Sequence, residues 1–304
     1  MSTPKKPKSQ GIALWIALSI LSWSSVASAC KWTLEYIDSS WTLFFSSLTS
    51  AVVLFILLLF HPSCSVNQKL KWKYLLMGFL NPFLYYFILF EAYRMSPAQE
   101  ALVLNYTWAI LLALLSAIYF RKALKWKSLL GMLISFLGVY VVVSKGSIFL
   151  PQWSLGNGLA LVSAVVWAVY WVLNMKEEGS PLPALFVQFS SASLLVLLFN
   201  LAVFPIPRTF SLWGIAGSIY LGIFEMSLPF FWWLLALKRS EQTSQTIHWV
   251  YLSPILSMVW IAILLKEEIR LYSILGLILV LMGILLGKGI NPNLDKRNRE
   301  IPAG

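Results

Sequence analysis

One carboxylic acid lies near the middle of a long apolar segment of the sequence. Glu225 falls within Leu212 to Leu237. A charge at mid-membrane depth is costly, so an ionisable group there is a candidate functional residue. Pro229 follows four residues later and cannot donate the hydrogen bond that would occupy the carbonyl oxygen of Glu225. A carboxyl group and a free backbone acceptor therefore coincide, and they could bind a solute or a proton. The alternative is a protonated Glu225 that is hydrogen-bonded to a neighbouring helix.

A similar combination occurs in the segment from Trp72 to Tyr93. Pro82 leaves the carbonyl oxygen of Gly78 without its usual donor, and the amide side chain of Asn81 is adjacent. We expect a helix break at both prolines, Pro82 and Pro229. The break near Asn81 suits a cavity that binds a solute, and it equally suits close packing of helices.

Polar and aromatic residues also follow a helical spacing between Pro97 and Phe120. Gln99, Asn105, Tyr106 and Trp108 include a stripe, because positions 99, 102, 105/106 and 109 recur at steps of three or four residues. We take Asn105, Tyr106 and Trp108 as candidate solute-binding residues.

Two further segments carry the remaining candidates. His248 and Tyr251 lie in Gln242 to Leu265, in which Pro254 is a third candidate helix break. A lone histidine in such a place is more often hydrogen-bonded to a neighbour than used in function. Trp167 and Trp171 lie four residues apart on one helical face, where packing is the ordinary role and an aromatic cage around an apolar or cationic solute is the alternative.

Several kinds of chemistry lack their motifs. The sequence contains no Gly-x-x-x-x-Gly-Lys-Ser/Thr loop for ATP, no His-Glu-x-x-His and no Gly-x-Ser-x-Gly. Cys30 and Cys64 match no metal-site spacing, and we predict no metal and no cofactor. A membrane enzyme acting on lipid would need at least two acid or base groups at the interface, which we do not find. We therefore do not expect an enzyme.

The composition indicates whether water or lipid surrounds the segments that hold these residues. Of 304 residues, 59% are hydrophobic and 12% are charged, and the mean hydropathy is +0.77. Such values are far from those of a water-soluble domain. The net charge of +11 comes from short basic clusters between apolar runs, so we predict a lipid bilayer and not a nucleic acid as the partner.

Ten apolar segments approach or exceed the roughly 20 residues that a spanning helix needs. They are Gly11 to Cys30, Asp38 to Phe60, Trp72 to Tyr93, Pro97 to Phe120, Trp126 to Ser144, Gly156 to Met175, Pro181 to Phe204, Leu212 to Leu237, Gln242 to Leu265 and Leu271 to Gly287. The first could instead be a secretory signal, because lysines precede it and small residues end it. It is long enough to span, and we count it as a helix.

The loop charges predict the orientation of these ten helices. Most of the 23 Lys and Arg residues fall in the loops on one side, together with the basic segment 1–10 and the tail 290–304. Positive loops face the cytoplasm, so we expect a multi-pass protein of the cell (inner) membrane with both termini cytoplasmic.

An internal repeat divides the chain into two halves. A shift of 145 residues places Tyr106 on Tyr251, Gly131 on Gly276, and Gly138 on Gly283 without a gap. The halves cover residues 11–146 and 153–289 and contain five helices each. Because five is odd, the second half enters the membrane from the opposite face. The expected fold is an all-α integral membrane protein with ten transmembrane helices in two inverted repeats.

These features resemble the drug/metabolite transporter superfamily, specifically its EamA-type members with ten helices. The residues that carry the resemblance are Ala236-Leu237-Lys238, Ser253-Pro254-Ile255, Lys266-Glu267-Glu268, Gly276 and Gly283 in the second half, and Ala92-Tyr93-Arg94, Asn105-Tyr106-Thr107-Trp108-Ala109, Gly131 and Gly138 in the first. The Asn-Tyr-x-Trp core is similar to that of the branch with aromatic amino acid exporters. Two departures are Ala109, where that pattern has proline, and Lys122, where it has an acid.

The resemblance implies a secondary-active transporter that works by alternating access. We expect an exporter of small amphipathic metabolites such as amino acids. A carrier of nucleotide-like or cationic solutes of the S-adenosyl type is the alternative, since Glu225 and the aromatic residues would suit them. Proton coupling and facilitated flux both stay open, and the sequence does not predict the oligomeric state.

Overall fold

A computed structural model describes residues 9–61, 72–121, 126–147, 152–174, 181–204, 207, 209–239 and 249–287. The regular structure within these ranges is helical. The first half contains α1 (Ser9–Thr33), α2 (Ser39–Leu59), α3 (Trp72–Gly78), η1 (Phe79–Leu84), α4 (Tyr85–Met95), α5 (Ala98–Asn105), α6 (Trp108–Tyr119) and α7 (Trp126–Val143). The second half contains α8 (Leu155–Asn174), α9 (Pro181–Val203), α10 (Leu212–Phe224), α11 (Leu228–Arg239), η2 (Trp249–Tyr251), α13 (Leu252–Trp260), η3 (Ile261–Leu265) and α14 (Leu271–Gly287).

The helices have the length and surface of membrane spans. Eight are long and apolar enough to cross a bilayer, and the shorter Trp249–Leu265 and Leu271–Leu286 complete ten segments in the described residues. Large apolar side chains cover the outside. On α7, for example, Leu133, Phe136 and Leu137 are each more than half exposed. Such a surface suits lipid and not water. The protein is a multi-pass membrane protein.

Small residues hold α7 and α14 together in a pattern with two-fold symmetry. A Cβ atom added to Gly138 would lie against the backbone oxygen of Gly276, and one added to Gly283 would lie against that of Gly131. The 145-residue shift turns each of these contacts into the other. Ser135 Oγ donates a hydrogen bond of 2.9 Å to the Val280 oxygen, and these residues are also 145 positions apart. The last helices of the two repeats therefore meet on a pseudo-two-fold axis.

The other helix contacts obey the same symmetry. The repeat relates α1 to α8, α2 to α9, α3 to α10, and α4 to α11. Helix α1 packs on α11, and its counterpart α8 packs on α4. In the same way, α2 packs on α10, and its counterpart α9 packs on α3. Arg121 and Lys266, which the shift also pairs, both have left-handed backbones with φ of 51° and 53°. These exchanges confirm the predicted all-α fold of ten helices in two inverted repeats.

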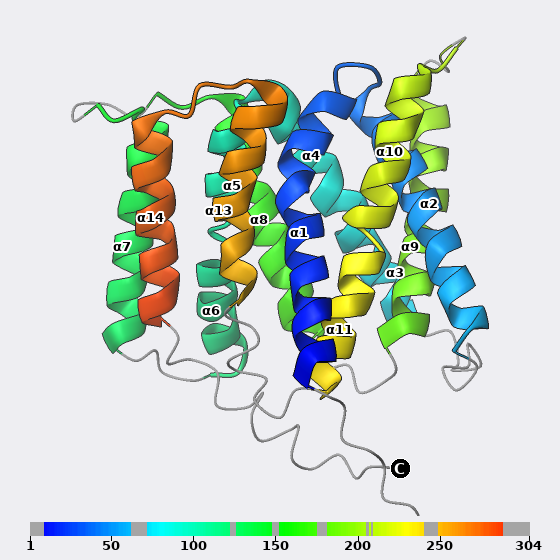
Figure 1. Cartoon of the computed structure of the whole chain (residues 1–304), viewed down its shortest axis with the longest axis horizontal. Coiled ribbons are helices and arrows are strands. Elements are labelled where there is room, and N and C mark those ends of the chain that lie inside the picture. Colours follow the sequence, from blue (N-terminus) through cyan, green and yellow to red (C-terminus); the bar gives the residue numbers. More distant parts are fainter. Residues whose placement is uncertain are drawn as a thin grey trace, which may run out of the picture.

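The spans stand side by side, with α7 and α14 at one end of the bundle and α2 at the other (Figure 1). The amino-terminal end of α1 and the carboxy-terminal end of α14 lie at the same face, the lower one in Figure 1. The loop that joins η3 to α14 lies at the opposite face. That the termini-bearing face is cytoplasmic stays a prediction from the loop charges.

Three central spans are interrupted near their middle. The third changes to a π-helical turn in which Asn81 has non-helical angles (φ −145°, ψ 119°). The fourth is interrupted at Tyr106 and Thr107, and the eighth between Phe224 and Leu228. Pro254 lies in the first turn of α13, just after the chain changes from the 3₁₀ turn η2 to an α-helix. A first-turn amide needs no partner within the helix, so proline is tolerated there, as Pro229 is in the first turn of α11.

Candidate functional site

The interruption of the eighth span places Glu225 between the two halves. Helix α10 ends at this residue, whose backbone has left ideal helical geometry (φ −111°, ψ −51°). Its side chain is only 9% exposed. The hydroxyl group of Tyr86, on α4 of the first half, donates a hydrogen bond of 2.7 Å to Glu225 Oε1. Among the described residues, no other Asp, Glu, Lys or Arg lies in the middle of a span.

Serine hydroxyl groups stabilise the broken backbone around Glu225. Ser50 Oγ donates to the Met226 oxygen at 3.0 Å, and Ser227 Oγ donates to the Gly222 oxygen at 2.8 Å. Carbonyl groups that a helix break releases must find partners away from water. The break is therefore a built part of the fold, and it fixes where the Glu225 side chain points.

An aromatic cluster surrounds Trp167, a buried residue of α8. Tyr85 stacks on it with ring centroids 4.4 Å apart, and Tyr170 stacks at 5.5 Å. Three more rings approach it edge-on. They belong to Trp108 at 6.5 Å, Trp171 at 5.8 Å and Phe230 at 6.1 Å, with interplanar angles of 90°, 86° and 66°. Both halves contribute rings, because Tyr85 and Trp108 precede the repeat boundary. Tyr85 also contacts Tyr86 at 4.7 Å, which joins the cluster to Glu225.

Asn105 ties the cluster to the end of α5. Tyr85 donates a long hydrogen bond of 3.3 Å to Asn105 Oδ1, and Asn105 Nδ2 donates to Ser163 Oγ at 2.9 Å. Asn105 is 7% exposed. Its neighbour Tyr106 is half-buried, and its hydroxyl group lies beside Ser253 without the geometry of an ordinary hydrogen bond.

Asn81 brings an unpaired amide to the same region. Its side chain is fully buried, and neither its nitrogen nor its oxygen has a hydrogen-bond partner of ordinary geometry in the described part of the chain. The hydroxyl group of Tyr170 lies beside it and donates to Gln188 Oε1 at 2.9 Å. An unsatisfied buried amide costs about 1–3 kcal/mol per group, so a polar partner supplied by a solute or by water would stabilise it.

The structure therefore brings together most of the sequence candidates. Asn81, Asn105, Trp108, Trp167, Trp171 and Glu225 lie in or beside this region. Tyr251 lies in the η2 turn and is close enough to Tyr106 to interact electrostatically. His248 lies outside the described residues. No group of His, Cys, Asp and Glu among the described residues could hold a metal ion.

Sequence reasoning missed Tyr85, Tyr86 and Tyr170 as site residues. Tyr85 and Tyr86 follow Asn81 by about one helical turn, and the repeat, with a two-residue adjustment of the 145-residue shift, pairs them with Trp232 and Trp233. That aromatic pair was the available signal. Tyr170 lies three residues after Trp167 and so shares its helical face.

Comparison with known proteins agrees with this architecture. The sequence matches the EamA-like transporter family over residues 10–144 and again over residues 154–287. It is similar to an uncharacterized transporter, YyaM, of Bacillus subtilis, with 25% identity over 270 residues that cover 86% of this chain and 88% of that protein.

Two further similarities concern a named exporter and a solved structure. The aromatic amino acid exporter YddG of Ancylobacter novellus is 27% identical over 177 residues, which cover 56% of this chain and 60% of the exporter. One crystal structure superposes with a TM-score of 0.64 at 22% identity, over 96% of this chain and 99% of that chain. At that identity the superposition shows a shared fold.

Proposed function

We propose that this chain, which belongs to the EamA-like transporter family, is a secondary-active carrier that exports small amphipathic metabolites such as amino acids. Its repeats, at residues 11–146 and 153–289, would rock against each other and expose a central site to each face in turn. The observation that carries this proposal is the Glu225–Tyr86 pair beside the aromatic cluster, since both are made of residues from the two halves.

Each part of the site suits one part of such a solute. Glu225 is an acid that can bind an ammonium group or a proton. The faces of Tyr85, Trp167 and Tyr170 suit an apolar or aromatic body. Asn81 has both donors and an acceptor free for a carboxyl or amide group. The similarity to an aromatic amino acid exporter supports this class of solute.

A second candidate is a cationic metabolite of the S-adenosyl type. The observation in its favour is that Glu225 has no basic neighbour in the middle of the described spans, while aromatic ring faces attract cations. A solute with a single positive charge would neutralise Glu225. A zwitterion would also bring a carboxylate, which only neutral groups of the site could bind.

Uptake into proteoliposomes separates these candidates. Radiolabelled aromatic amino acids, aliphatic amino acids and an S-adenosyl compound would each be tested with and without a pH gradient. Saturable flux of the aromatic amino acids supports the first candidate, and saturable flux of the S-adenosyl compound alone supports the second. Stimulation by the gradient indicates proton coupling. Product formation in place of flux would indicate an enzyme and contradict both candidates.

A further inference from the structure

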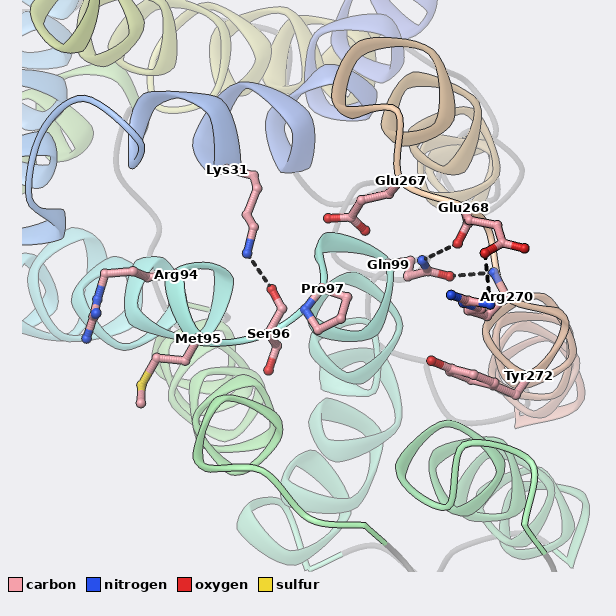
Figure 2. A pocket seen from close by; sticks show the side chains of 10 residues that line it. All are labelled: Lys31, Arg94, Met95, Ser96, Pro97, Gln99, Glu267, Glu268, Arg270 and Tyr272. Carbon is pink, nitrogen blue, oxygen red and sulfur yellow. Dashed lines mark hydrogen bonds and ion pairs between the residues drawn. The ribbon is translucent and has the colours of Figure 1, made fainter.

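A network of four hydrogen bonds joins the two halves at the face opposite the termini. Figure 2 shows the bonds that Gln99 makes within it. Three consecutive residues at the start of α5 bond to the segment that leads into α14 and to the first turn of α14 itself. The bonds are Ala98 N to Glu267 Oε1 at 3.1 Å, Gln99 Nε2 to the Glu268 oxygen at 3.0 Å, Arg270 N to Gln99 Oε1 at 2.9 Å, and Tyr272 OH to Glu100 Oε1 at 2.9 Å. We refer to these seven residues as the latch.

The latch has the chemistry of a strong but breakable contact. Glu267 places a carboxylate on a free backbone N–H at the start of α5, where the helix dipole favours negative charge. Gln99 is 3% exposed and satisfies both ends of its amide on the backbone of the other half. Glu100 is 2% exposed. Because Gln99 and Glu100 are buried, separating them from their partners requires water or another partner to enter.

The latch lies between a cavity and the candidate solute site. A cavity of about 480 Å³ opens at this face and is lined by Lys31, Arg94, Gln99, Glu267 and Arg270 among others (Figure 2). On the inner side, the eight-residue helix α5 runs from the latch to Asn105 of the aromatic region. Movement of the latch would therefore move a wall of that site.

The inverted repeat does not reproduce the latch at the other face. The 145-residue shift carries Glu267 to Lys122 and Tyr272 to Lys127, while Ala98, Gln99 and Glu100 become Thr243, Ser244 and Gln245. A lysine cannot accept a hydrogen bond, and it carries the wrong charge for a helix amino terminus. The sequence of the other repeat therefore lacks both the acid equivalent to Glu267 and the hydroxyl group equivalent to that of Tyr272.

We propose that the latch is the gate of the face opposite the termini, and that the replacement of its acid and its tyrosine by Lys122 and Lys127 in the other repeat makes closure of this face the resting state. The proposal rests on the carrier function proposed above. Rocking of the halves toward that face must break all four bonds, whereas opening toward the termini-bearing face leaves them intact. The solute site is thus accessible mainly from the termini-bearing face until the latch breaks.

Cys30 is a native reporter for this gate. Its thiol is fully buried, and it lies near the side chains of Tyr85 and Tyr93, next in sequence to the cavity-lining Lys31. In a Cys64→Ser background, a membrane-impermeant maleimide added to intact cells, and separately to inverted vesicles, would report access to Cys30 from each face. The readout needs no solute, so it stays informative even if the proposed substrate class is wrong.

Three substitutions test the latch. Glu267→Ala and Gln99→Ala remove acceptors or donors, and Tyr272→Phe removes a single hydroxyl group with little risk to folding. Each should raise the labelling rate of Cys30 from the latch face about tenfold, which corresponds to about 1.4 kcal/mol. Glu268→Ala is the matched control, because its side chain is 75% exposed and its ion pair with Arg270, at 2.9 Å, stays within the second half. Only the backbone oxygen of Glu268 bonds across to the first half.

A further variant separates hydrogen bonding from charge. Glu267→Gln keeps an acceptor oxygen for Ala98 but removes the negative charge. The labelling rate of Cys30 should stay within about threefold of the parent, because the interaction of that charge with the helix dipole is a smaller contribution than the hydrogen bond. Unchanged labelling of Cys30 in Tyr272→Phe, Glu267→Ala and Gln99→Ala would overturn the proposal. An equal increase in the control Glu268→Ala would also overturn it.

Discussion

The hydroxyl group of Tyr86 in the first half donates a hydrogen bond of 2.7 Å to the carboxyl group of Glu225 in the second half. The two residues are 139 positions apart and meet where the third and eighth spans are both interrupted. Since the repeat relates those spans, the pair lies close to where the halves must move past each other. A bound cation or proton at Glu225 would compete with the Tyr86 hydroxyl group and so link occupancy to the contact between halves.

The first prediction concerns Glu225. If the carrier is coupled to protons, Glu225→Gln should abolish the pH dependence of transport in vesicles, because an amide cannot bind and release a proton between pH 5 and 8. Glu268→Gln, which changes an exposed acid, should leave it unchanged. Initial rates across a pH series measure this, and equal flux of Glu225→Gln and the parent at every pH would refute a coupling role.

Tyr86→Phe tests the partner of Glu225 while keeping the ring. A hydrogen bond to a charged group contributes about 1.5–3 kcal/mol, so transport should fall about 10- to 100-fold. The matched control is Tyr220→Phe, which loses a hydroxyl group that bonds Ser25 at 2.7 Å outside the site. Similar rates for the two variants would show that the Tyr86 hydroxyl group has no part in transport.

Trp167→Leu tests the aromatic cluster. It removes the ring on which Tyr85 and Tyr170 stack, and aromatic contacts of this kind contribute about 0.5–1.5 kcal/mol. The KM for an aromatic amino acid should rise up to about tenfold, with a smaller change for an aliphatic one. Trp213→Leu, at a ring that is 60% exposed, is the control. An equal rise for both solutes would indicate a packing role only.

Gly138→Ala tests the pseudo-two-fold contact of α7 and α14. The added methyl group would meet the Gly276 backbone oxygen, so the free energy of unfolding should fall by about 1–3 kcal/mol. Gly158→Ala is the control, because no atom lies within 4 Å of its added Cβ. Thermal unfolding in detergent measures both. Equal midpoints for the two variants would contradict close packing of these helices.

The sequence allowed the elements to be predicted better than their mutual arrangement. Apolar length located the spans, and Pro82 and Pro229 marked where two of them are interrupted, because proline removes a backbone donor wherever it stands. The interruption at Tyr106 and Thr107 was not predicted, since no proline marks it. Apolar residues surround most spans, so hydrophobicity alone does not specify which side of a helix faces its neighbours.

The site illustrates the same limit. Glu225 stood out because one charged residue in an apolar segment is a local signal. Tyr86 as its partner, and Trp167 as the centre of a cluster, depend on the rotation of α4, α8 and α10 about their axes. That rotation is set by packing contacts such as those of the glycines and serines, which involve residues far apart in the sequence.

Counterflow in proteoliposomes tests the central claim, that this chain is a carrier with one alternating site, most directly. Vesicles are loaded with an unlabelled aromatic amino acid and diluted into a trace of the labelled compound. A carrier predicts a transient accumulation of label above its equilibrium level, which disappears when no solute is preloaded. Simple equilibration of label with no overshoot, for this and every other solute of the panel, would contradict the account.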